Sequence, residues 1–300
     1  MIGILQILTI PAHDSREKLS LIVKIVTDST ADLPEDLVNE LGVTVVPCYV
    51  CFGKDLYRDR VDISEDDFYK RLLQDSTFPT TTQPTVEDFA KVYRELSSKA
   101  DAIISIHISK KLSGTCNSAL QGKKLVENVC PIEVVDSETT TMALGLTVVA
   151  AAAIAKRGNS MQQMLDDIRQ VVPDVQLFVL FDTLKYLAKG GRIGKAKSLL
   201  GSLLSVKPIL KIKDGEFVPV VQMRSRAKGM EKLFDLAREV GNIEDLAITY
   251  STTPDDARAL ADQINSTLHP KQVRVARVGA VLGVHGGPGV IAMAFRTRSL

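Results

Sequence analysis

Hydroxyl-bearing residues at the start of a predicted helix give this chain a candidate anion site. The run Ile103–Ile108 is rich in β-branched residues and predicts a buried strand, and a helical pattern follows over Leu112–Glu127. Ser113-Gly114-Thr115 therefore falls where the strand gives way to the helix. The first N–H groups of a helix lack internal partners and lie at the positive end of its dipole, so hydroxyls beside them can cradle a phosphate or a carboxylate. Such a cradle binds an anion but supplies nothing to attack it.

A second hydroxyl-rich segment, Pro79–Thr85, reads P-T-T-T-Q-P-T and is stiffened by its two prolines. A helical pattern follows it, and Thr85 with Asp88 resembles a capping box in which Asp replaces the usual Glu or Gln. Capping explains Thr85 but leaves the three preceding threonines without a role. We therefore interpret this segment as a second wall of the anion site, with simple helix capping as the alternative for both segments.

The composition argues against several functional classes. The chain has 37 basic and 36 acidic residues, a net charge of +1 and no Trp, so nucleic acid is not expected as a general partner. The longest apolar segment, Met142–Ala155, is shorter than the roughly 20 residues that span a bilayer, and it predicts a buried helix without stable membrane insertion. Four cysteines without a disulfide framework indicate a reducing compartment, and the expected location is cytoplasmic.

Two of the cysteines, in Cys48-Tyr49-Val50-Cys51, have the spacing of a redox or zinc motif. They lie in Val43–Phe52, an extended apolar stretch that is predicted as a strand region, and residues three apart in a strand point to opposite faces. No second Cys pair or matching His pair completes a metal site. We therefore expect two buried strand cysteines and no metal site.

Short apolar runs alternate with helical patterns in the first half, which predicts an α/β fold with a mostly parallel sheet flanked by helices. We place an N-terminal extension at residues 1–22, an N-terminal α/β domain at 23–165 and a C-terminal α/β layer domain at 166–300. Ligands of parallel sheets bind beyond the carboxyl ends of the strands, so Thr27–Thr30, Ser109–Thr115 and Asp136–Thr141 should converge. A cleft between the two domains is then the expected ligand site.

The extension at residues 1–22 contains an apolar run, Ile2–Ile10, that no basic region precedes and no clear small-residue cleavage site follows. It does not match a signal peptide. We interpret it as a mis-assigned start or a loosely packed arm before the first strand.

The segment Lys189–Lys195 reads K-G-G-R-I-G-K and invites comparison with a phosphate-binding loop. No glycine stands at the required distance before Gly194-Lys195, and Ala196 replaces the hydroxyl that would hold magnesium. The wider stretch Lys185–Gly194 is instead predicted as a flexible basic connector. With Arg224 and Arg226 it could form a docking edge for an acidic partner.

Several motifs in a fixed order resemble the DegV family over roughly Val23 to the C-terminus. The matching segments are Thr27–Asp32, Thr81–Thr85, Leu112–Thr115 with Ser118-Ala119, Val135–Ser137, Tyr186–Ile193 and His285–Gly289. The resemblance implies a two-domain α/β protein that binds one long-chain fatty acid between its domains. It further implies the acyl-carrying subunit of a bacterial fatty-acid kinase, in which a separate ATP-dependent subunit phosphorylates the bound carboxylate to an acyl phosphate.

The resemblance also assigns site residues. Thr81 and Ser113 resemble the hydroxyls that hold the carboxylate, and Thr82 and Gly114 belong to the same two motifs. His285, expected in a glycine-rich C-terminal loop, resembles the histidine that joins this hydrogen-bond network. The family usually has Thr after this histidine, and Gly286 stands there instead, which removes one hydroxyl. Two basic residues near the mouth, Arg192 and Arg224, would meet the kinase subunit. No cofactor is expected besides the fatty acid.

A fatty acid is physically consistent with these residues. An acyl chain of about sixteen methylenes, at ~0.8 kcal/mol each, would contribute on the order of 10 kcal/mol before the costs of binding. The carboxylate needs donors because burying a bare charge is costly, and uncharged hydroxyls leave an oxygen free for phosphoryl transfer. Ala150–Ala155, Leu199-Leu200 and Leu203-Leu204 are candidate linings of the apolar tunnel, with ordinary core packing as the alternative.

Three functions stay open from the sequence. The first is a lipid carrier without catalysis of its own. The second is a hydrolase or transferase acting on an acyl or phosphorylated substrate with Ser113 as nucleophile, although no base is evident and His107 lies within a strand, where we expect it to be packed. The third is a small-molecule sensor without a kinase partner.

Overall fold

Four parallel strands of the N-terminal half form the first sheet of the protein, whose computed structural model describes residues 21–126, 129–199 and 206–297. The strands stand in the order β2-β1-β6-β7, and each pairs in parallel with its neighbours. Their bounds are Val23–Asp28 for β1, Thr44–Val46 for β2, Ala102–His107 for β6 and Ile132–Asp136 for β7. The predicted mostly parallel sheet is confirmed.

Six strands of the C-terminal half form the second sheet, in the order β10-β9-β8-β13-β11-β12. All neighbours pair antiparallel except β11 and β12, which are parallel. The predicted turn at Asp214-Gly215 joins β9 to β10, and Asp214 takes the left-handed conformation that such a turn requires. The strands are β8 Val175–Leu180, β9 Lys207–Lys213, β10 Glu216–Met223, β11 Ile243–Tyr250, β12 Gln272–Arg277 and β13 Ile291–Thr297.

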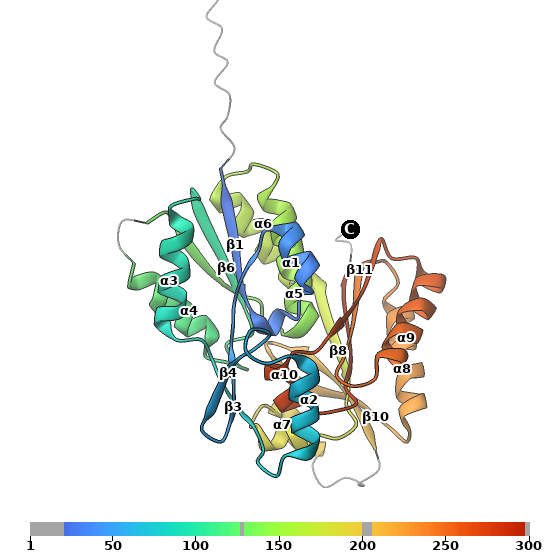
Figure 1. Cartoon of the computed structure of the whole chain (residues 1–300). Coiled ribbons are helices and arrows are strands. Elements are labelled where there is room, and N and C mark those ends of the chain that lie inside the picture. The colour runs from blue at the N-terminus through green and yellow to red at the C-terminus, as the bar shows by residue number, and fades with distance from the viewer. Residues whose placement is uncertain (1–20, 127–128, 200–205, 298–300) are drawn as a thin grey trace, which may run out of the picture.

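The helices arrange these two sheets into layers (Figure 1). Helices α3 (Val86–Ser97) and α4 (Thr115–Lys124) pack on the outer face of the parallel sheet. Helices α8 (Arg226–Val240) and α9 (Pro254–Leu268) cover the far face of the second sheet. Between the sheets lies α5 (Thr141–Ala155), beside α6 (Met161–Asp174). The α1 helix (Glu35–Leu41) follows a short 3-10 turn, η1 (Ser29–Ala31).

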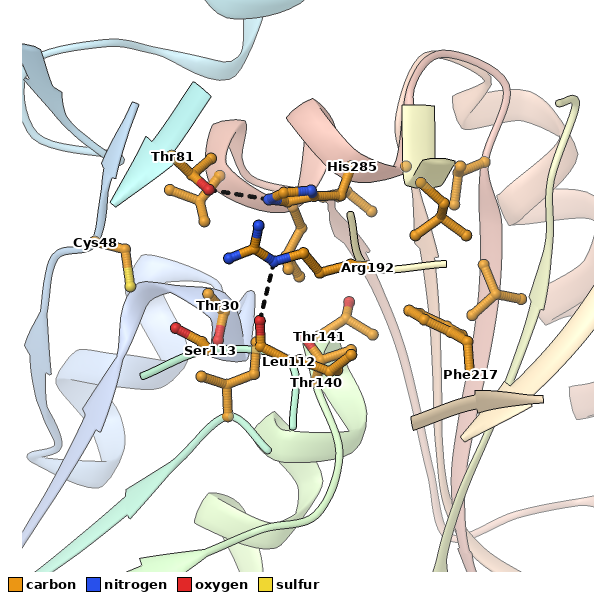
Figure 2. A pocket seen from close by; sticks show the side chains of 18 of the residues that line it. Thr30, Cys48, Thr81, Leu112, Ser113, Thr140, Thr141, Arg192, Phe217 and His285 are labelled. Atoms are coloured by element: carbon orange, nitrogen blue, oxygen red, sulfur yellow. Dashed lines mark hydrogen bonds between the residues drawn. The ribbon is translucent and has the colours of Figure 1, made fainter. Parts of the chain in front are cut away.

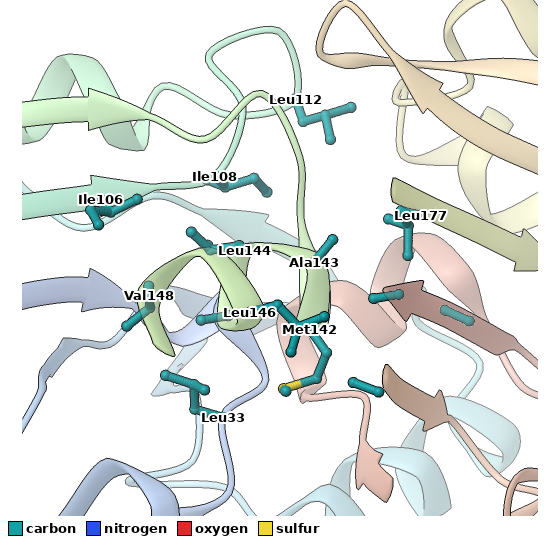
Figure 3. Packing of buried hydrophobic residues seen from close by; sticks show 14 of the residues in the cluster. Leu33, Ile106, Ile108, Leu112, Met142, Ala143, Leu144, Leu146, Val148 and Leu177 are labelled. Atoms are coloured by element: carbon teal, nitrogen blue, oxygen red, sulfur yellow. The ribbon is translucent and has the colours of Figure 1, made fainter. Parts of the chain in front are cut away.

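The central helix α5 joins the two halves into one core. Twelve of its fifteen residues are buried, because both faces of the helix meet a sheet. Figure 3 shows Leu144 and Leu146 of this helix between Ile106 of the first sheet and Leu177 of the second, all in one hydrophobic cluster. The predicted boundary between residues 165 and 166 falls inside α6. None of the helices that the structure describes is long and apolar enough to cross a membrane.

A small third sheet, in the order β4-β3-β5, was not predicted. It consists of β3 (Tyr49–Phe52), β4 (Asp55–Arg58) and β5 (Thr80–Thr82), with α2 (Glu65–Gln74) between β4 and β5. The strand region predicted over Val43–Phe52 divides around Pro47, which lacks an N–H donor, into β2 and β3 of different sheets. Three threonines of the Pro79–Thr85 segment, Thr80–Thr82, form the strand β5 because they pair with β3.

Three further expectations are corrected by the chain's own contacts. The helix expected over Leu112–Glu127 starts only at Thr115, because the N–H groups of Leu112 and Ser113 bond back to Ser109 O in a turn. The basic connector contains a short helix, α7 (Lys185–Lys189), and a 3-10 segment, η2 (Gly194–Leu199). Of the two cysteines expected to be buried in a strand, Cys48 is buried but precedes β3, and Cys51 in β3 is half-buried.

His285 lies in a helix, α10 (Ala280–Gly286), and not in the expected loop. The first N–H groups of this helix are satisfied by carboxylates from the other half of the chain. Gly279 N donates to Asp32 Oδ1 at 2.8 Å, and Ala280 N donates to Asp59 Oδ1 at 3.0 Å. Such capping explains how so short a segment, with Gly283 inside it, forms a helix.

Candidate functional site

A pocket lies where the carboxyl ends of β1 and β6 approach the inner face of the second sheet. The empty space between its walls is about 960 Å³, part of it open to solvent. Thr30, Ser113 and Thr140 line it, so the three loops predicted to converge do meet here. Most of the remaining wall is apolar: Ile108, Leu112, Val179, Phe181, Leu187, Phe217, Val278, Val281, Leu282, Val290 and Ala292.

Thr81 and His285 form a hydrogen-bonded pair on one side of this pocket (Figure 2). Thr81 Oγ1 and His285 Nε2 lie 2.9 Å apart, although 204 residues separate them in the chain. Burial, with a smaller contribution from the positive charge of Arg192, lowers the pKa of His285 to about 4. The imidazole is therefore neutral near pH 7 and can either donate or accept, and its buried Nδ1 has no partner among the described residues.

Ser113 lies on the turn before α4, on the pocket wall. Its Oγ is 2.8 Å from Thr115 Oγ1 and accepts from Thr115 N at 3.3 Å. Gly114 is the N-cap of α4 and offers no side chain to cap it. The positive end of a ten-residue helix is thus adjacent to the Ser113 hydroxyl, as the sequence indicated.

Gln83 connects the two hydroxyl-rich segments, and sequence reasoning gave it no role. Its side chain packs so closely on Gly114 that a Cβ there would lie 2.3 Å from Gln83 Oε1. Gln83 Nε2 also donates to Ser118 Oγ at 3.1 Å. Gln83 and Gly114 both belong to the motifs that carried the family resemblance, so these motifs were the sequence signal from which a role for Gln83 could have been predicted. Gly114 therefore serves at least to seat Gln83.

The structure brings most of the predicted site residues together. The members that line the pocket are Thr81, Thr82, Ser113, Arg192 and His285, whereas Gly114 and Arg224 do not. The Arg192 side chain extends over the pocket in Figure 2, and its Nε donates to Leu112 O at 3.2 Å. Arg224 is exposed just after β10.

The predicted apolar lining differs from the observed one. Ala150–Ala155 lies in the far half of α5, and neither it nor Leu199 is on the pocket wall. Leu200, Leu203 and Leu204 fall outside the described residues. The second sheet supplies much of the apolar wall instead, because its inner face meets the strand ends of the first.

Replacing Gly190 by alanine is expected to disrupt the Thr81–His285 pair. A Cβ at Gly190 would lie 2.1 Å from His285 Nδ1, so the imidazole must move. We expect the affinity for a ligand bound at this pair to fall about tenfold, as for the loss of a well-placed hydrogen bond, measured by displacement of a fluorescent probe bound in the pocket. Gly191→Ala is the matched control: it strains a left-handed backbone but has no atom within 4 Å to displace. Equal affinities of the two variants would contradict the prediction.

Within the described residues, no base is hydrogen-bonded to Ser113, as a nucleophilic role would favour. The hydrogen bonds of Ser113 Oγ there involve Thr115 and no imidazole or amine. His107 is fully buried between Asp28 and Ser105, so the expectation that it is packed is confirmed. Among the described residues, no group of three or more His, Cys, Asp or Glu side chains could hold a metal ion.

Comparisons with known proteins agree with this geometry. A family model described as "Uncharacterised protein, DegV family" matches residues 22–298. A DegV domain-containing protein of Streptomyces coelicolor is 36% identical over 284 residues, covering 93% of this chain and all of the relative. Among solved structures, a fatty-acid-binding DegV family protein from Thermus thermophilus matches with a TM-score of 0.87 and 34% identity, over 93% of this chain and 100% of its own. A stearic-acid-binding protein from Eubacterium ventriosum matches with a TM-score of 0.85 and 30% identity, over 92% and 98%.

Proposed function

The chain belongs to the DegV family, and from this we propose that it binds one long-chain fatty acid in the pocket between its two large sheets. The carboxylate lies at Thr81, Ser113 and His285, with Thr82 beside them, and the acyl chain follows the apolar wall. The binding of fatty acids by similar proteins of known structure supports this assignment.

The observation that carries the proposal is the Thr81–His285 pair at one side of a largely apolar cavity. Burial of an acyl chain against an apolar wall stabilises the complex by ~0.8 kcal/mol for each methylene group. Two hydroxyls, a neutral imidazole and the N-terminus of α4 can hold a carboxylate without a fixed ion pair. Arg192 adds a positive charge at the pocket without bonding to His285.

Native mass spectrometry of the purified protein, followed by organic extraction, tests fatty-acid binding. We expect a stoichiometric fatty acid, and a roughly tenfold to hundredfold loss of affinity in Thr81→Ala and in Ser113→Ala, because hydrogen bonds to a charged group contribute about 1.5–3 kcal/mol. Thr80→Ala is the matched control, since Thr80 is exposed on the same strand and is not part of the pocket wall. A protein that is empty as purified and takes up no added fatty acid would overturn the proposal.

The protein then acts as a cytoplasmic carrier without chemistry of its own. It presents the bound carboxylate to a separate ATP-dependent kinase subunit, which converts it to an acyl phosphate. Arg192 and the exposed Arg224 offer positive charge to an acidic partner surface. Reconstitution with such a kinase subunit and ATP should give acyl phosphate, trapped as the hydroxamate. Tight fatty-acid binding with no phosphorylation would favour the sensor function instead.

A further inference from the structure

A glycine-rich segment, Gly286–Val290, links α10 to β13 and forms part of the pocket. It reads G-G-P-G-V, and Gly286 and Val290 line the pocket wall. Glycine has more backbone freedom than any other residue, so a segment with three glycines keeps one conformation only where contacts hold it. His285 immediately precedes this segment. The position of its imidazole therefore depends on what fixes the glycines.

Arg226, the first residue of α8, holds the segment at Gly289. Its Nη1 donates to Gly289 O and, at 3.0 Å, to Asp182 Oδ1. Its Nε donates to Asp256 Oδ2 at 2.7 Å, and its Nη2 donates to Thr253 Oγ1 at 2.7 Å. All three guanidinium nitrogens are thus engaged within the chain, although the sequence suggested that Arg226 could face an acidic partner.

Gly289 packs closely against the groups that hold it. A Cβ at Gly289 would lie 2.2 Å from Asp182 Oδ2. Thr252 Oγ1 accepts from Gly289 N at 3.0 Å, so both backbone polar groups of this glycine are bonded. The planar guanidinium of Arg226 sets the direction of several hydrogen bonds at once, which a lysine ammonium does not. Arg226 therefore fixes Gly289 relative to the residues after β8 and at the start of α9.

The imidazole of His285 depends on this anchor because its own side chain makes few polar contacts. Nε2 lies 2.9 Å from Thr81 Oγ1, and the buried Nδ1 has no partner among the described residues. Val290, on the other side of Gly289, is held independently, since its N and its O both bond to Ser251. Loss of the anchor should therefore displace the chain toward His285 and not toward β13.

We propose that Arg226 is a positioning residue of the fatty-acid site, which holds His285 against Thr81 by anchoring Gly289. The inference rests on the function proposed above, in which His285 contacts the carboxylate. It gives Arg226 a different role from Arg224, two residues earlier, whose side chain is exposed.

Histidine NMR spectra of the delipidated protein test the positioning step without any ligand. His285 is one of four histidines, and its resonance is identified by its absence from His285→Ala. We expect Arg226→Lys, which keeps the charge but loses the planar fork, to shift this resonance. Arg238→Lys is the matched control and should leave it unchanged, because Arg238 lies on the same helix but bonds at the surface to Asp235.

A double-mutant cycle tests the consequence for binding, by displacement of a fluorescent fatty acid. We expect Arg226→Lys to bind the fatty acid about threefold to tenfold more weakly than the parent protein, as for the loss of one hydrogen bond. When His285 is already alanine, the same change should alter the affinity by less than about twofold, because the two residues act as one unit. A role in overall folding would instead weaken binding equally in both backgrounds.

Denaturant midpoints show whether each variant is folded. Asp182→Asn weakens the same anchor and is put through the same cycle if Arg226→Lys folds poorly. An unmoved His285 resonance, an undiminished affinity in Arg226→Lys, or an equal loss in both backgrounds would overturn the inference. A parent protein that binds no fatty acid would instead overturn the proposed function, and the NMR spectra would still decide whether Arg226 positions His285.

Discussion

Alanine in place of Asp28 is expected to destabilise the folded protein by about 4 kcal/mol or more. Asp28 ends β1 and is fully buried. Its Oδ2 accepts from His107 Nδ1 at 2.9 Å and from Ile108 N at 3.1 Å, and its Oδ1 accepts from the N and Oγ1 of Thr30. The variant leaves all four donors buried without an acceptor, and each such group costs about 1–3 kcal/mol.

The loss of Asp28 should also weaken the hydrogen bonds of the buried residues connected to it through His107. With Nδ1–H donated to Asp28, His107 Nε2 accepts from Ser105 Oγ, which in turn accepts from the Tyr93 hydroxyl. Urea unfolding at constant pH measures the effect, and Asp136→Ala is the control. Asp136 ends β7 at the same sheet edge but is partly exposed, so its loss should cost about 1 kcal/mol. Comparable losses in the two variants would show that the buried network contributes no special stability.

Signals from residues close in sequence were sufficient to predict much of this fold. The capping box of Thr85 and Asp88 is present as predicted, with Thr85 Oγ1 accepting from Asp88 N and Asp88 Oδ2 accepting from Thr85 N. The convergence of the three loops followed from one property of parallel sheets, namely that their strands end at the same edge. These features depend on residues close in sequence or on a general rule of topology.

Features that depend on distant partners could not be predicted locally. The strand β5 exists because Thr81 lies opposite Val50, and α10 exists because Asp32 and Asp59 cap it from more than 200 residues away. Neither segment has a hydrophobic periodicity that predicts a strand or a helix, and the threonines of the first and the glycines of the second suggested loops instead. The candidate site divides in the same way. Ser113 was predicted from its place at a helix start, and Arg192 was predicted only as part of a basic docking edge, whereas His285 came only from the resemblance.

Asp59 is expected to make the protein less stable as the pH rises. The carboxyl is 2% exposed, its Oδ1 accepts from Ala280 N, and its Oδ2 has no partner among the described residues. Burial raises the pKa of Asp59 to about 7, and the opposing attraction of Arg60 only partly offsets this. Between about pH 4 and pH 7 the folded state therefore holds a proton that the unfolded state has released, so stability falls as the pH rises through this range.

His285 changes the stability with pH in the opposite direction. A measurement on the parent protein alone would therefore hide the effect of Asp59. Because the pKa of His285 is lowered to about 4, its stabilising contribution is complete above the unfolded pKa of roughly 6.5 and is lost as the pH falls toward 4. The two residues therefore offset each other between pH 5 and pH 8. The quantity to measure is the difference in unfolding free energy between Asp59→Asn and the parent protein at each pH.

That difference should shift in favour of Asp59→Asn by on the order of 2–3 kcal/mol between pH 5 and pH 8. Asparagine keeps an oxygen for Ala280 N but has no proton to release, so the loss of stability associated with Asp59 disappears. Urea unfolding across this range gives the curve, and Asp62→Asn is the control, because the pKa of Asp62 is lowered to about 2 by Arg58 and it does not titrate there. A difference that stays constant with pH would show that Asp59 is ionised throughout, with Arg60 outweighing its burial. A shift of the expected sign would mean that α10, the helix that carries His285, is capped by a carboxyl that changes its charge near neutral pH.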